Sequence, residues 1–489
     1  MIGAAPTRVS RRLEPRMVTF LGVMAAMFLS ALDQTIVGTA MPTIAKDMGG
    51  LDRYTWVTTV YLLTSTAVVP VVGKLSEQLG RKRVFMAAIV AFLGGSALCG
   101  AAPTMTLLIA FRGLQGIGAG MLTGTAFAVI AELFSPAERG RYVGMMTGVF
   151  GLSSVVGPLI GGGLTDHVGW RWVFYVNLPI GVAVLAALAR TFPASVRPAQ
   201  RPRIDVLGAA LIASGAALLT LGISLQGTDG WGSPLVWGGL ALGAVLLVVA
   251  IFVEARTPEA VLPPELFRSS IFTLSIVVTF LVGAVMFGTI TYIPLFLQRV
   301  VGEAATNSGL QLLPLMAGLL VASIVGGQVL SRTGRYRVQA IAGVGLMGLG
   351  VLLATPLSAT SSQLAVMPSM VVIGLGLGLS MPVFNVVAQN AVPHRLMSSA
   401  TSALQFIRQM GAGLGLAVMG SYFNTRLAIH GAQHQGQKVA LAGSIHDVFV
   451  ISLLICGLAL AAAAFIREIP LRTRAHAEEQ REALASAVA

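Results

Sequence analysis

The sequence predicts an all-α polytopic membrane protein with 14 transmembrane helices, arranged as two six-helix bundles plus two inserted helices. Three observations predict this class. Of the 489 residues, 55% are hydrophobic and only 10% are charged, whereas a soluble domain carries about 25% charged residues. Basic residues cluster between long apolar stretches, and one short motif recurs in both halves of the chain. The only cysteines, Cys99 and Cys456, exclude a disulfide scaffold.

Fourteen apolar stretches have the length of about 20 residues that is needed to cross roughly 30 Å of hydrocarbon. They are Val18–Met41, Trp56–Leu79, Val84–Ala102, Leu107–Leu133, Tyr142–Leu164, Val173–Ala189, Val206–Leu225, Pro234–Val253, Ile271–Leu297, Gly309–Leu330, Val338–Leu357, Leu364–Val387, Ser399–Phe423 and Val448–Ile466. The first stretch is too long for a cleaved signal peptide and lacks a clean small-residue cleavage site.

The basic residues predict the orientation. With the N-terminus placed in the cytoplasm, the inside segments hold 24 of the 32 Lys and Arg residues and the outside segments hold 6. Cytoplasmic loops carry such an excess, so we expect a multi-pass protein of the inner (cytoplasmic) membrane with both termini cytoplasmic. The same clustering argues against nucleic-acid binding, despite the net charge of +13.

A short segment after the second predicted span recurs after the tenth. Gly73–Val84 and Gly327–Val338 share Gly, Gly, Arg, Arg and Val in register. Chance is the alternative, because Gly and basic residues are common at cytoplasmic helix ends. Eight spans separate the copies instead of six, so spans seven and eight are predicted to be an insertion. The expected domains are 1–189, a six-helix bundle; 190–269, a linker with two inserted helices; and 270–489, a second bundle with a cytoplasmic tail. Parallel repeats imply two halves that rock about a central site.

Five motifs in order resemble those of the fourteen-helix drug:proton antiporters of the major facilitator superfamily. They are Leu32–Pro42, Gly73–Val84, Arg112–Gly120, Gly148–Gly162 and Gly169–Pro179. The resemblance implies multidrug efflux, as in antibiotic resistance, by alternating access. It also implies that the proton gradient supplies the energy and that no cofactor is needed. No phosphate-binding loop for ATP is found in the sequence.

Asp33 is the only acid deep within a predicted span. It lies 15 residues from Val18, about 22 Å along a helix, and so in the outer half of the membrane. A bare carboxylate at depth is costly, so it should line a cavity, be protonated or be paired. Arg112 enters its span from outside and also reaches the outer half, where it can approach Asp33 or extend to the interface. The resemblance implies proton coupling at both residues.

Arg408 lies about 14 Å into the thirteenth span, with no second deep acid to pair with. It is expected either to contact substrate or an anion, or to hydrogen-bond with Gln405 or Gln409. In the antiporters that the chain resembles, this helix often carries an acid. The absence of one here leaves open the number of coupled protons and whether multivalent cations are substrates.

The loop motif and the fifth span predict conformational parts. Glu77 can pair with Arg81 locally or with Arg141, closing an inner gate in which Gly73 and Gly80 permit close approach and a tight turn. A solvated basic loop is the alternative. In span five, the glycines and one proline favour close packing against the other half or a bending point. These residues are Gly148, Gly151, Gly157, Pro158 and Gly161, and the resemblance implies an antiporter-type seal; ordinary packing is the alternative.

Five further residues are candidates for lining a central cavity: Phe287, Tyr292, Met381, Asn385 and Gln405. For the aromatic and Met residues singly, packing or lipid contact is the stronger expectation. A metal site at His430, His434 and His446 is conceivable in the outside loop Asn424–Asp447. A solvated loop is favoured there, so no metal is expected.

We therefore expect a monomeric, proton-coupled exporter of a small lipophilic, in some cases cationic, substrate, working within the lipid bilayer. An exporter of a native lipid or metabolite is the first alternative. A membrane-embedded enzyme would need clustered acids, a metal-binding pair or a nucleophile with a base at depth, and none is found, so no enzymatic activity is expected. A non-transporting receptor or scaffold is the remaining alternative, and it would not require an isolated acid within the membrane. The sequence leaves open whether a periplasmic partner docks on the outside loops.

Overall fold

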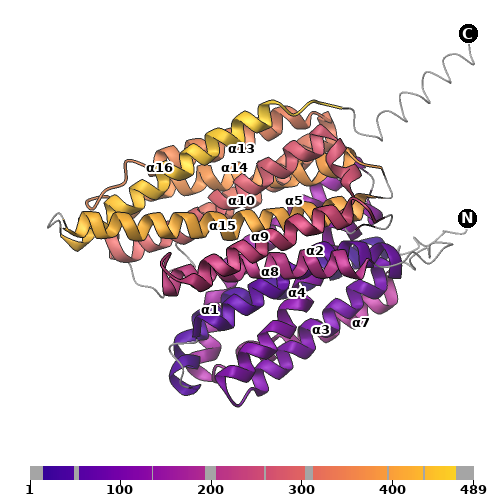
Figure 1. The fold of residues 1–489 in the computed structure, drawn as a ribbon, viewed down its shortest axis with the longest axis horizontal. Helices are drawn as coiled ribbons and strands as arrows, with labels where there is room; N and C mark the ends of the chain where they lie inside the picture. Colours follow the sequence, from indigo (N-terminus) through magenta and orange to yellow (C-terminus); the bar gives the residue numbers. More distant parts are fainter. Residues whose placement is uncertain are drawn as a thin grey trace, which may run out of the picture.

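Helices pack side by side in two groups (Figure 1). This computed structural model describes residues 15–48, 54–134, 136–192, 205–257, 260, 262–302, 312–393, 396–432 and 436–469, and these ranges contain helices and no strand. The first group, the N half, holds α1 (Pro15–Met48), α2 (Tyr54–Leu79), α3 (Arg81–Ala101), α4 (Met105–Leu133), α5 (Pro136–His167), α6 (Trp172–Tyr175) and α7 (Asn177–Thr191).

The second group, the C half, comes from the part of the chain that begins at Ser270. It holds α10 (Ser270–Phe296), the π-helical turn η2 (Leu297–Val301), α12 (Leu313–Thr333), α13 (Tyr336–Ala354), α14 (Gln363–Asn390), α15 (Met397–Ala432) and α16 (Gln437–Ala464). Between the halves in sequence come α8 (Val206–Asp229), α9 (Pro234–Glu254) and the short 3-10 helix η1 (Pro264–Arg268).

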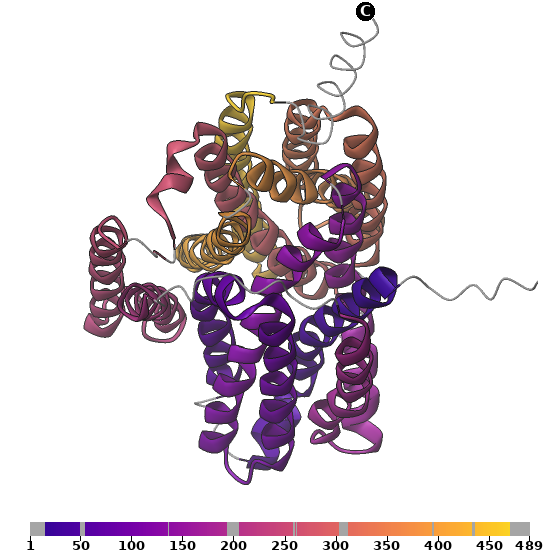
Figure 2. The same ribbon diagram turned by 90° about the vertical axis from the view of Figure 1, so that its right-hand side faces the viewer.

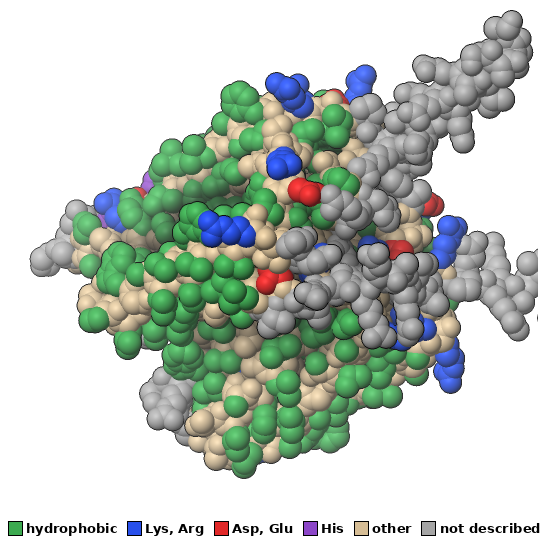
Figure 3. All heavy atoms as spheres, turned by 45° about the vertical axis from the view of Figure 1, so that its right-hand side comes forward, with side chains coloured by type: hydrophobic (Ala, Val, Ile, Leu, Met, Phe, Trp, Pro, Cys, Tyr) green, Lys and Arg blue, Asp and Glu red, His purple; other side chains and the backbone are tan. Residues whose placement is uncertain are grey.

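Each predicted apolar stretch falls on a helix, and the sixth is divided between α6 and α7. By length and composition, eleven helical segments in the described part of the chain could cross a membrane. Helices α5, α8 and α15 are not among the eleven. The fold is therefore all-helical and multi-pass, while fourteen crossings stay a prediction. Hydrophobic side chains cover much of the outer surface, as a bilayer requires (Figure 3).

Local sequence features fix where several helices begin. The side chains of Thr104, Asp205 and Ser269 accept hydrogen bonds from backbone N–H groups in the first turns of α4, α8 and α10. Such caps satisfy donors that have no partner within the helix. Two glycines adopt positive φ angles at the short turns before α3 and α13: φ is 89° at Gly80 and 68° at Gly334.

The repeat motif has the same structural role in both halves. Gly80 and Gly334 are equivalent positions, and so are the residues two places later, Lys82 and Tyr336. Lys82 Nζ donates to the backbone oxygens of Ala189 and Phe192 at the end of α7. Tyr336 donates through its hydroxyl to the oxygen of Arg467, just beyond α16. In each half, the third helix is therefore tied to the end of the last helix by the same position.

The two halves meet mainly through α5 with α12 and α2 with α15, and also through α5 with α14 and α4 with α15. In the repeat numbering, the first two pairs join a fifth helix of one half to a second helix of the other. The three larger hydrophobic clusters each lie mainly in one half, and a fourth joins α2 to α8 and α15. Helices α8 and α9 pack on each other beside the two groups (Figure 2). Helix α8 also contacts α2 and α15, so it covers one seam between the halves. The domain limits at 189 and 269 stay predictions.

The prediction that Asn424–Asp447 forms a loop is wrong. Helix α15 continues to Ala432 and α16 begins at Gln437, so most of the segment is helical. Asp447 Oδ2 joins the two helices, because it lies 2.5 Å from Arg426 Nε and 3.1 Å from His430 Nε2. His446 instead contacts the backbone oxygen of Thr355, and His434 lies outside the described residues. No group of three metal-ligating side chains occurs among the described residues.

Candidate transport site

Asp33 and Arg112 form an ion pair inside the N half. Asp33 lies in α1 and Arg112 in α4, and Arg112 Nη1 is 2.5 Å from Asp33 Oδ2. Their side chains are 0% and 1% exposed. The guanidinium also lies 4.0 Å from the centre of the Tyr61 ring, and its Nε donates to the oxygen of Val57 at 3.3 Å. The depths predicted from sequence indicated that Arg112 can approach Asp33, and the structure brings these two residues, 79 positions apart, into contact.

Two amide side chains complete the contacts of the carboxylate. Gln115 Nε2 and Asn177 Nδ2 donate to Asp33 Oδ1 at 2.8 and 3.0 Å. Gln115 Oε1 also accepts from Arg112 Nη1 at 2.9 Å. Asn177 donates in addition to Ser96 Oγ, which donates to the oxygen of Phe174. The network therefore draws on α1, α2, α3, α4, α6 and α7, and none of its described components lies in the C half.

Sequence analysis assigned no role to Gln115 or Asn177. Gln115 lies three residues after Arg112, and residues at that spacing share a helix face. Asn177 begins α7 directly after the break that follows α6. Both lie in segments that resemble family motifs, and a polar side chain within an apolar span is the signal that would have identified each one.

The chemistry of this network depends on its charge balance. With Asp33 ionised, the pair is neutral and the carboxylate accepts three hydrogen bonds. Adding a proton to Asp33 would leave the cation of Arg112 without a counter-charge in a buried site. Leaving a buried charge uncompensated costs about 3–5 kcal/mol. Protonation of Asp33 would therefore favour a rearranged structure, which is a property that a coupling site requires.

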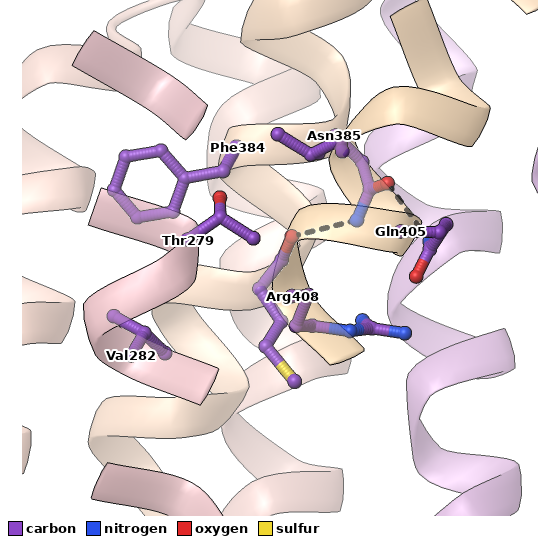
Figure 4. Close-up of a pocket in the computed structure, with 8 residues that line it drawn as sticks. Thr279, Val282, Phe384, Asn385, Gln405 and Arg408 are labelled. Carbon is purple, nitrogen blue, oxygen red and sulfur yellow. Dashed lines mark hydrogen bonds between the residues drawn. The ribbon is translucent and has the colours of Figure 1, made fainter. Parts of the chain in front are cut away.

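A second polar site lies in the C half, around Arg408 of α15. A small cavity there is lined by Thr279 and Val282 from α10, by Met381, Phe384 and Asn385 from α14, and by Leu404, Gln405 and Arg408 from α15. Figure 4 shows these side chains converging from the three helices. Asn385 Nδ2 donates to the oxygen of Met381, and Gln405 Nε2 donates to Asn385 Oδ1 at 3.3 Å.

The structure separates the predicted cavity residues into two sets. Met381, Asn385 and Gln405 line the cavity beside Arg408. Phe287 does not line it and is 37% exposed on α10. Tyr292 is buried against Phe423, with ring centres 5.3 Å apart. The positions of Phe287 and Tyr292 fit the packing and lipid-contact alternatives.

The residues predicted to form an inner gate lie near the end of α2 and the beginnings of α3 and α5. Arg81 Nη1 is 2.9 Å from Glu132 Oε2 and 2.8 Å from the oxygen of Ala128, both in α4. Glu132 is an acidic partner that sequence analysis did not identify. The side chain of Glu77 lies outside those that the structure describes, so its pairing stays a prediction. Arg141 is exposed, with its guanidinium 5.8 Å from the Tyr142 ring centre. Gly73 is buried near the end of α2.

The glycines of α5 face two different neighbours. Gly148 and Gly151 pack on Leu320 and Met316 of α12, in the other half. Gly157 and Gly161 pack on Thr35 and Thr39 of α1, in their own half. Pro158 lies inside α5, and its side chain is outside those described. Close packing against the other half therefore involves only the first part of the motif.

Comparison with known proteins gives this arrangement its family. A family model described as Major Facilitator Superfamily matches residues 23–416. The chain belongs to the major facilitator superfamily. It is a multi-pass membrane transporter of that family.

Two bacterial relatives and one solved structure are similar over most of the chain. The multidrug transporter protein MdtP of Bacillus subtilis (strain 168) is 41% identical over 413 residues, 84% of this chain and 76% of that protein. Multidrug resistance protein 3 of the same organism is 35% identical over 402 residues, 82% and 78% of the two chains. The crystal structure of the human organic anion transporter MFSD10 (TETRAN) aligns with a TM-score of 0.64 at 14% identity, over 90% of this chain and 99% of that chain. At that identity the structural similarity supports the fold alone.

Proposed function

We propose that this transporter is a proton-coupled antiporter that exports lipophilic compounds from the cell. The single observation that carries the proposal is the buried ion pair of Asp33 and Arg112, enclosed by Gln115 and Asn177. A charge at membrane depth is expensive and is retained where it has a function. The two relatives named as multidrug proteins support the substrate class.

The proposed cycle couples the charge state of Asp33 to movement of the two halves. A proton that enters from outside neutralises Asp33 and releases Arg112 from its counter-charge. Release of that proton toward the cytoplasm restores the pair, and substrate moves in the opposite direction. Movement between the halves would change the contacts of α5 with α12 and α14 and of α15 with α2 and α4, because these are where the two groups meet.

The membrane arrangement is part of the same proposal. Fourteen crossings with both termini in the cytoplasm agree with the distribution of Lys and Arg, and the cytoplasmic membrane is where an inward proton gradient is available. Arg81 and Glu132 would then lie at the inner end, where an ion pair that opens and closes could contribute to gating. We propose a monomer that needs no cofactor and carries out no covalent chemistry on its substrate.

A direct test is transport of a lipophilic dye into proteoliposomes under an imposed pH gradient. The comparison is between wild type, Asp33→Asn and a control on the same helix, Asp47→Asn. Asp47 is exposed and accepts a hydrogen bond from Trp170 Nε1 at 3.1 Å, which an Asn oxygen can also accept. We expect gradient-driven uptake to be abolished in Asp33→Asn and retained in Asp47→Asn, with both variants eluting as folded protein. Equal gradient-driven uptake in wild type and Asp33→Asn would rule out coupling at Asp33.

A further inference from the structure

Arg408 is a cation of the C half with no counter-charge among the described residues. It lies in α15, eleven residues after the first residue of that helix, about 16 Å along its axis. No hydrogen bond or ion pair to its guanidinium occurs within the described part of the chain, and Asp33 is already paired with Arg112. A guanidinium has five donors and cannot lose its proton in a protein. The side chain is partly exposed, so its donors are open to an acceptor from outside the chain.

Two further polar groups on the same cavity also lack partners. Thr279 is 7% exposed and Gln405 is 1% exposed. Their buried atoms Thr279 Oγ1 and Gln405 Oε1 have no hydrogen-bond partner among the described residues. Native proteins leave few such atoms unsatisfied, and an unexplained one indicates a missing water, ion or ligand. Two buried polar atoms without partners, beside the open donors of Arg408, point to a polar ligand group at this cavity.

The two neighbouring glutamines do not hydrogen-bond with Arg408 in the described part of the chain. Gln409 accepts a hydrogen bond from Thr66 of α2 through its Oε1, at 2.7 Å. Gln405 donates to Asn385, which in turn donates to Met381. The predicted hydrogen bonding of Arg408 with Gln405 or Gln409 is therefore not what the structure has. The Thr66–Gln409 contact also places this part of α15 directly at the seam with the N half.

The space and the chemistry together restrict the ligand group. The cavity has a volume of about 10 Å³, which is room for roughly one water molecule. In this conformation it has room for one oxygen of a larger molecule, and the rest of that molecule must lie outside the cavity. Hydrogen bonds between a guanidinium and a carboxylate oxygen are stronger than those between neutral groups. The hydroxyl of Thr279 can add a further donor.

We propose that Arg408, assisted by Thr279, binds an anionic carboxylate group of the transported compound. The inference rests on the proposed export function and names the chemical class of the substrate. Carboxylate-bearing amphiphiles, including zwitterions, would be preferred over their neutral or purely cationic esters. Gln405 Oε1 would accept a hydrogen bond from a hydroxyl or a water that accompanies the carboxylate.

The test uses one fluorophore in two forms. Tetramethylrhodamine carries a free carboxylate, and its methyl ester has the same ring system without that charge. Fluorescence anisotropy measures the binding of each dye to purified, detergent-solubilised full-length protein. In the wild type, we expect the free acid to bind more tightly than the ester. In Arg408→Gln, we expect the Kd of the free acid to rise at least about tenfold and that of the ester to stay within about twofold.

Two further variants keep the result independent of folding. Thr279→Val removes the hydroxyl at similar volume and should weaken binding of the free acid alone. Arg426→Gln removes a positive charge from the outer end of the same helix, away from the cavity, and should change neither Kd. If Arg408→Gln does not elute as folded protein, Thr279→Val decides the outcome.

Several results would overturn the inference. These are no binding of the free acid by wild type, equal binding of acid and ester, equal losses for both dyes in Arg408→Gln, and no change in either. Transport under a pH gradient is measured in parallel. Absence of gradient-driven transport with carboxylate-selective binding intact would count against the proposed function and leave this inference standing.

Discussion

At the scale of single residues, the structure places two charged side chains of α1 and α4 in direct contact in the interior of the N half. Asp33 and Arg112 are both almost completely buried. A buried pair contributes little net stability, because the loss of hydration offsets the attraction. Removing one partner is different, since the other then remains charged and unpaired. This difference makes the pair testable by stability as well as by transport.

We predict that Asp33→Leu and Arg112→Leu are each destabilised by about 3–5 kcal/mol, and that the double variant is less destabilised than either single one. Thermal unfolding of the solubilised proteins measures the ranking through their midpoints. Additive losses in the double variant would show that the two side chains do not act as a pair.

The hydrogen bonds around Asp33 support a second prediction at this scale. Asn177→Ala removes the donor to Asp33 Oδ1 and the donor to Ser96 at once. We expect a loss of about 1–3 kcal/mol, because two hydrogen bonds to buried acceptors are lost while Gln115 still donates to Asp33 Oδ1. Thermal midpoints again provide the measurement, with Ser214→Ala as a control, since that exposed hydroxyl contacts only its own helix. Equal midpoints for Asn177→Ala and wild type would contradict the proposed importance of this bond.

Sequence reasoning reached only part of this site. Depth within two spans was enough to predict that Asp33 and Arg112 can approach each other, because both depths fall in the outer half of the membrane. Depth did not identify Gln115 or Asn177 as partners, since hydrogen bonding between helices depends on how each helix is rotated about its axis. Phe287 does not line the cavity and is partly exposed, which fits the packing or lipid contact that was the stronger expectation for it.

At the scale of helices, α5 is the element that connects the halves most closely. A Cβ atom at Gly144 would collide with the backbone oxygen of Ser323 in α12. A backbone atom cannot move aside as the end of a side chain can. Gly144 was not among the motif glycines that the sequence singled out, yet it makes the tightest contact with the backbone of the other half.

We predict that Gly144→Ala destabilises the conformation seen here by about 1–3 kcal/mol, the usual cost of overpacking. The separation of α5 and α12, measured between spin labels on the two helices, should shift toward longer distances. Gly162→Ala is the matched control on the same helix, because nothing lies within 4 Å of a Cβ placed there. An unchanged distance distribution in Gly144→Ala would mean that α5 does not hold the halves together.

Helix positions were well predicted from hydropathy, and helix ends were not. Apolar runs indicate which residues lie in lipid, so each predicted stretch falls on a helix. They do not indicate where a helix continues into water. Helices α15 and α16 extend past their apolar parts, where Asp447 contacts Arg426 and His430. The break between α6 and α7 was missed, although the polar residue Asn177 begins α7 and Pro179 follows within its first turn.

At the scale of the whole molecule, the two copies of the twelve-residue motif lie at equivalent places in the two groups of helices. They place Gly80 and Gly334 at turns with positive φ, and Lys82 and Tyr336 in equivalent contacts. The pairing of α5 with α12 and of α2 with α15 then follows from the same approximate symmetry. The position of α8 against α2 and α15 was outside the reach of the sequence, because an inserted hairpin has no counterpart in the repeat.

The orientation in the membrane gives a prediction for the molecule as a whole. Lys46 and Arg83 are both exposed and lie on opposite predicted sides. A membrane-impermeant maleimide should label Lys46→Cys in intact cells, and Arg83→Cys only after permeabilisation. Cys99 and Cys456 are buried and free, so wild type should show little background. The reverse labelling pattern would invert the proposed topology.

The central claim is that protons move through the protein in exchange for substrate, by way of Asp33. The most direct measurement is the internal pH of proteoliposomes, reported by trapped pyranine, while a dye gradient alone is imposed. The account predicts that downhill dye movement through wild type drives protons the opposite way, and that Asp33→Asn allows dye exchange without any pH change. Proton movement of equal size in Asp33→Asn would contradict it.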